Sequence, residues 1–89
     1  MKLNENYILR TVAGSDVVVA VGEEAAKLRG MMTLNDTAAF IWHCLEKEFD
    51  EEKIIAKLKE EYTGADDETL KSELQAFLGK LIDMGILKE

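Results

Sequence analysis

The spacing of apolar residues changes from a period of two to a period of about 3.6 near Asn35, and this change constrains the fold more than any other feature of the sequence. Before Asn35, runs of β-branched and aromatic residues are separated by turn-forming residues, which is typical of strands. After Asn35, apolar residues recur three and four positions apart, which is typical of amphipathic helices. In a chain of 89 residues, strands followed by helices predict one α+β domain over residues 1–89.

The first part of the chain predicts a three-stranded antiparallel sheet, with strands at about 7–12, 17–21 and 28–34. Turn-forming residues at 13–16 separate the first two strands, so these should form a hairpin. The second strand is apolar on both faces, which favours a position between two neighbours. The third strand would therefore pair with the second and keep its far edge open.

The rest of the chain predicts three helices, at about 36–48, 51–63 and 67–84. An amide or acidic side chain can cap each of them, and the candidates are Asn35 or Asp36, Asp50, and Asp66 or Asp67. The third helix has a continuous apolar stripe, which consists of Leu70, Leu74, Phe77, Leu78, Leu81 and Ile82. Three strands followed by these helices resemble a winged helix-turn-helix.

The charge balance argues against the DNA-binding role that such a fold often has. The chain has 18 acidic and 11 basic residues, a formal net charge of −7, and such a field repels phosphate backbones and anionic lipid surfaces. The longest apolar run, Val17–Val21, is far too short to cross a bilayer. We therefore expect a cytoplasmic protein that binds neither nucleic acid nor membranes.

His43 and Cys44 are the only histidine and the only cysteine, and they are adjacent. Adjacent residues on a helix project about 100° apart, so this pair cannot act as base and nucleophile. We expect Cys44 in the core and His43 exposed or half-exposed. No set of metal ligands and no phosphate-binding glycine motif is evident. The sequence predicts no catalytic residue, metal or cofactor, and hence no enzyme.

Two local features allow more than one interpretation. Met31 and Met32 are consecutive on a predicted strand, so their side chains point to opposite faces. The pair can therefore be interpreted as core residues or as part of a binding surface. Gly79 lies inside the third helix, where glycine costs about 1 kcal/mol relative to alanine. A tight contact with another helix would explain Gly79, and we favour it over space left for a bound chain.

The segment Thr33–Trp42, followed by a helix with Ile54-Ile55 and Glu61-Tyr62, resembles the PqqD family. The closing segment Phe77–Leu87 is similar to the C-terminal helix of that family. The likeness covers essentially the whole chain, in order. The chain departs from the family pattern at residues 48–52, where a glycine-containing turn and a threonine are usual, and at Gly79.

The resemblance implies a recognition element that binds the leader of a ribosomally synthesised precursor peptide and presents it to a modifying enzyme, often a radical S-adenosylmethionine enzyme. An extended leader can add a fourth strand to the open edge of the third strand. The expected peptide-binding residues are Leu28, Arg29, Gly30, Met31, Met32, Thr33 and Leu34 on the strand, and Leu70, Leu74, Phe77, Leu78 and Leu81 on the third helix.

Several alternatives stay open at this point. Either Arg29, Met31 and Thr33, or the opposite phase with Gly30 and Met32, would face the peptide. The open edge also allows either a monomer or an edge-strand dimer. A structural interaction module without a peptide ligand is the alternative function, and a winged-helix DNA-binding protein is disfavoured by the charge.

Overall fold

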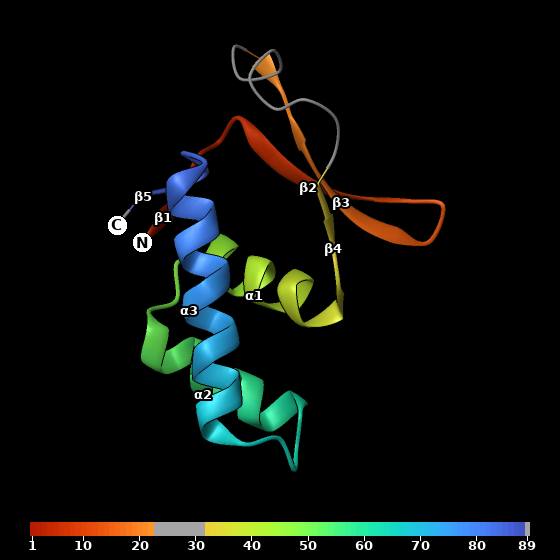
Figure 1. Cartoon of the computed structure of the whole chain (residues 1–89). Coiled ribbons are helices and arrows are strands. Elements are labelled where there is room, and N and C mark those ends of the chain that lie inside the picture. Colours follow the sequence, from red (N-terminus) through yellow and green to blue (C-terminus); the bar gives the residue numbers. More distant parts are fainter. Residues whose placement is uncertain (23–31, 89) are drawn as a thin grey trace.

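A computed structural model of the chain describes residues 1–22 and 32–88 and confirms the predicted α+β architecture, with a three-stranded antiparallel sheet followed by three helices (Figure 1). Predicted strand residues Leu28–Met31 lie outside the described residues. The elements are β1 (Lys2–Leu3), β2 (Tyr7–Val12), β3 (Ser15–Ala20), β4 (Met32–Leu34), α1 (Asp36–Glu46), α2 (Glu51–Glu61), α3 (Asp67–Asp83) and β5 (Leu87–Lys88).

The sheet has the order β2-β3-β4, so β3 is the central strand, as its apolar faces predict. Val18 of β3 lies opposite both Leu9 and Met32, and these three side chains face the helices. The strand begins at Ser15, two residues earlier than predicted, because the hairpin turn is shorter. Its two residues, Ala13 and Gly14, both have positive φ angles, as the tightest twisted hairpin turns require.

The predicted capping side chains stand at the helix starts. The Asn35 side chain accepts a hydrogen bond from the amide of Ala38, and the Asp50 side chain accepts one from the amide of Lys53, each at 2.8 Å. Asp66 occupies the third N-cap position without a side-chain bond of this kind. The helices end one or two residues before the predicted positions, and none of those described is long and apolar enough to cross a membrane.

Helix α1 is the centre of the core. Trp42 and Ile41 are almost completely buried, and the cluster around them joins the sheet, the other two helices and the C-terminal strand. The buried members from the other elements are Tyr7, Val18, Leu34, Ile54, Leu58, Leu70, Leu74, Leu78, Leu81, Ile86 and Leu87. One continuous core therefore fixes α3 and the sheet relative to α1.

A second, two-stranded sheet joins the two ends of the chain and was not predicted. Lys2 pairs with Lys88 and Leu3 with Leu87, and the amide of Asn4 donates to the carbonyl of Ile86 at 2.7 Å. Figure 1 shows the two termini side by side. Leu87 is buried, so this pairing closes the core beneath the end of α3.

Gly79 and Gly85 have different roles in and after α3. Gly85 has a φ of +74°, and the amides of Gly85 and Ile86 donate to the carbonyls of Ile82 and Leu81, a hydrogen-bond pattern that commonly ends helices. Gly79 is helical, and no described atom outside its immediate helix neighbourhood lies within 4 Å of where a Cβ would stand. The favoured explanation of Gly79, a tight contact with another helix, is therefore wrong.

Alanine at these two glycines should have opposite effects on stability. We expect Gly79→Ala to raise the free energy of unfolding by about 0.5–1 kcal/mol, because the helix gains propensity and the methyl group meets open space. Gly85→Ala should lower it by about 1–2 kcal/mol, because its conformation is left-handed. Urea unfolding of both variants checks the pair, and a destabilised Gly79→Ala variant would contradict the account of Gly79.

Candidate functional site

The sheet has two edge strands, β2 and β4, and the candidate site is built on β4. Strand β4 pairs with β3 on one side, and within residues 1–22 and 32–88 no strand pairs with its other side. Met32 and Leu34 point toward the helices and pack in or against the core, whereas Thr33 is exposed on the opposite face. The structure thus orients the described part of the strand, with Met32 on the helix side and Thr33 facing away from it.

A hollow of about 320 Å³ begins where β4 ends. Its floor is the first two turns of α1, and its wall is the middle of α3. The lining residues are Asn35, Thr37, Ala38, Ile41, Glu73, Ala76, Phe77 and Lys80. Because Met32 and Leu34 also face the helices, the hollow lies on the side of the sheet to which alternate residues of an added strand would point. The strand edge ends at Leu34 and the hollow begins at the next residue, Asn35, and we call the two together the β4–α3 groove.

The predicted helix-side residues divide into two groups. Phe77 is half-buried and lines the hollow. The others are at most 4% exposed and belong to the core, and they are Leu70, Leu74, Leu78 and Leu81. These four hold the wall in place from behind, and their part in binding stays a prediction, as does that of Leu28, Arg29, Gly30 and Met31, which lie outside the described residues.

Several lining residues were not predicted from the sequence. They are exposed residues of α3 that border its apolar stripe near Phe77. Glu73 precedes Phe77 by four residues, Ala76 precedes it by one, and Lys80 follows it by three. Those spacings place them on the face of the helix that Phe77 occupies or beside it. Their position next to Phe77, the one aromatic residue of the stripe, is a sequence signal from which these lining residues could have been predicted.

A larger hollow, of about 390 Å³, lies on the other side of α3. It separates α2 from α3, and its lining residues are Glu51, Glu52, Ile55, Lys59, Lys71, Leu74 and Gln75. A hydrogen bond of 2.7 Å from the Gln75 amide to Glu51 joins the two helices across it. None of its lining residues adjoins β4, whereas the hollow beside Phe77 begins at Asn35, directly after that strand. A peptide strand paired with β4 would therefore lie away from the hollow between α2 and α3. Size alone therefore does not make it the better site.

Comparison with models of known protein families assigns this chain to a family. The family model described as Coenzyme PQQ synthesis protein D (PqqD) matches residues 17–87, a span that includes β4 and all three helices. The chain belongs to the PqqD family. A search among curated proteins found no match.

A solved structure extends the likeness of this PqqD-family chain to its three-dimensional fold. The structure is "TbiB1 in Complex with the TbiA(beta) Leader Peptide", and it matches with a TM-score of 0.79 at 22% sequence identity. The match covers 99% of this chain and 95% of that one. At this level of identity the likeness shows a shared fold.

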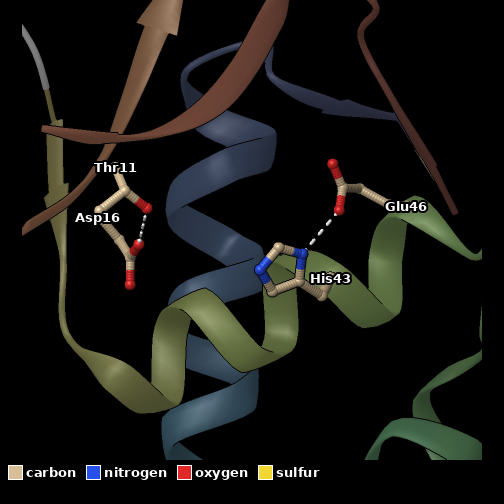
Figure 2. Close-up of polar contacts among 4 residues, drawn as sticks. All are labelled: Thr11, Asp16, His43 and Glu46. Carbon is tan, nitrogen blue, oxygen red and sulfur yellow. Dashed lines mark hydrogen bonds and ion pairs between the residues drawn. The ribbon is translucent and has the colours of Figure 1, made fainter.

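The residues that could carry chemistry in this PqqD-family domain lie apart from the groove. Burial raises the pKa of the Cys44 thiol, with opposing contributions from Lys47 and Lys57, so the less reactive protonated form is favoured. His43 Nδ1 lies 2.8 Å from Glu46 Oε1 (Figure 2). His43 follows Ile41 by two residues and so lies on the opposite side of α1 from the hollow. Among the described residues, no group of three metal-ligating side chains comes together.

Proposed function

We propose that this domain binds the leader segment of a ribosomally synthesised precursor peptide, as an added strand on the free edge of β4. The observation that carries the proposal is that this edge strand ends at Leu34 and the next residue, Asn35, lines the hollow between α1 and α3. Membership of the PqqD family and the fold shared with TbiB1, whose structure holds a leader peptide, support the same reading.

Strand addition would divide affinity and selectivity between two parts of the groove. Backbone hydrogen bonds to β4 do not depend on the sequence of the peptide and would supply general affinity. Neighbouring residues on paired strands point to the same face, so leader residues beside Met32 and Leu34 would enter the hollow. Phe77 and Ala38 are half-buried and offer an apolar surface there, so an apolar leader side chain is the expected anchor.

The second part of the proposal is that the domain presents the peptide and does not itself modify it. Its buried thiol and its outward-facing histidine lie away from the groove, so the bound peptide would not meet either one. A separate modifying enzyme would then act on the core of the precursor, and by resemblance to the family a radical S-adenosylmethionine enzyme is the expected kind. Co-purification of the domain with such an enzyme, strengthened by the precursor, would test this part.

Titration of isotope-labelled protein with a leader peptide encoded beside this gene tests the binding proposal. We expect amide shifts to concentrate on Met32, Thr33 and Leu34 and on residues 73–80 of α3. Slowed hydrogen exchange along β4 should accompany them, because strand addition protects backbone amides. Shifts confined to α2 and to Lys71 and Gln75 would place the ligand in the other hollow. No binding by any encoded leader would favour a structural interaction module.

A further inference from the structure

The α3 wall of the β4–α3 groove has one charge on each side of its aromatic residue. Glu73 precedes Phe77 by four residues and Lys80 follows it by three, so all three residues lie on one side of the helix. Both charged side chains are exposed at the rim of the hollow. Neither has an ion-pair partner among the residues that the structure describes. Both charges are therefore available to a ligand.

The distance between the two charges fits the repeat of an extended chain. Seven residues of helix separate Glu73 from Lys80 by about 10 Å along the axis. An extended chain rises about 3.3 Å per residue and turns every second side chain to the same face. Residues two positions before and two after an anchor are therefore about 13 Å apart on one face. The distance along the helix and the distance along the extended chain differ by little, and flexible glutamate, lysine and arginine side chains are long enough to bridge that difference.

The direction of the added strand sets the order of the charges on it. All pairs in the sheet of β2, β3 and β4 are antiparallel, and antiparallel pairing is the more stable arrangement per residue. An antiparallel leader would run opposite to β4. Figure 1 shows β4 descending toward α1 while α3 ascends, so such a leader would run in the same direction as α3. Its earlier residues would lie nearer Glu73 and its later residues nearer Lys80.

We propose that the groove selects a leader with a basic residue two positions before its apolar anchor and an acidic residue two positions after it. This inference rests on the proposed strand addition and adds the polarity and charge order of the ligand. Glu73 would pair with the basic residue and Lys80 with the acidic one. Exposed ion pairs contribute modestly, about two- to fivefold in affinity each, so the pattern biases the choice of peptide without supplying most of the affinity.

Two synthetic 12-residue peptides of equal composition test the proposal, one centred on Lys-Thr-Leu-Thr-Glu and the other on Glu-Thr-Leu-Thr-Lys. We expect the wild-type domain to bind the first peptide about three- to tenfold more tightly by NMR titration, with the difference shrinking in 0.5 M salt. The double variant E73K/K80E should reverse the preference. The control variant K57E/E60K exchanges an exposed pair on α2 without changing the net charge, and it should keep the wild-type preference.

The outcomes separate this proposal from the function on which it rests. Equal affinities for the two peptides, with amide shifts at Leu34 and Phe77, would overturn the charge preference and leave strand addition supported. A preference for the second peptide would overturn the proposed order. Binding of neither peptide would also overturn the charge preference, because the pattern would then not suffice for recognition. Strand addition itself is tested separately by the encoded leader.

Discussion

Replacing Trp42 with alanine is expected to lower the free energy of unfolding by about 3–5 kcal/mol. Trp42 is fully buried in α1 and is the largest side chain of the core. Its removal would leave a cavity between elements that belong to different parts of the chain, and these cannot all move together to fill it. A domain of this size typically has about 5–15 kcal/mol of stability in total, so the variant should be largely unfolded in mild denaturant.

Far-UV circular dichroism during urea unfolding is the measurement, since the variant lacks the only tryptophan fluorophore. Trp42→Phe is the matched control. The indole Nε1 of Trp42 is buried without a hydrogen-bond partner in the described part of the chain, so phenylalanine loses some packing but also removes an unpaired donor. We therefore expect Trp42→Phe to lose clearly less stability than Trp42→Ala. Equal losses in the two variants would contradict the packing account.

The sequence predicted the main elements because their apolar residues have regular spacing. The change of period near Asn35 separates the sheet from the helices, and the capping side chains of Asn35 and Asp50 mark two helix starts. The strands at the chain ends could not be found in this way. Strands of two residues have no measurable alternation, and the pairing of Lys2 with Lys88 joins opposite ends of the chain.

The groove was only partly predictable for a different physical reason. An apolar stripe indicates which face of a helix is buried but does not say whether a core or a ligand buries it. On α3 the core buries Leu70, Leu74, Leu78 and Leu81, and the groove borders the stripe at Phe77. The charged and small residues beside Phe77 have the composition of an ordinary solvated surface. Only the position of α3 relative to β4 and α1 distinguishes them.

Filling the groove from α3 is expected to weaken binding of the encoded leader at least tenfold. Ala76 is exposed and lines the hollow beside Phe77. In an Ala76→Trp variant, the helical rotamers of the indole lean toward the preceding turn, over Glu73, which also lines the hollow. The apolar surface of Phe77 and Ala38 favours an indole inside the hollow over one in water. The space for the anchor of the leader would then be occupied.

Ala56→Trp is the matched control, because Ala56 is an exposed alanine on α2 that lines neither hollow. Isothermal titration calorimetry should give the wild-type affinity for this variant and a clearly weaker one for Ala76→Trp, while urea unfolding shows both to be folded. Wild-type affinity in both variants would exclude the hollow beside Phe77 as the anchor site. Backbone pairing with β4 alone would then have to account for binding, and such pairing does not distinguish one peptide sequence from another. A loss confined to Ala76→Trp would instead show that the hollow is where a leader is chosen.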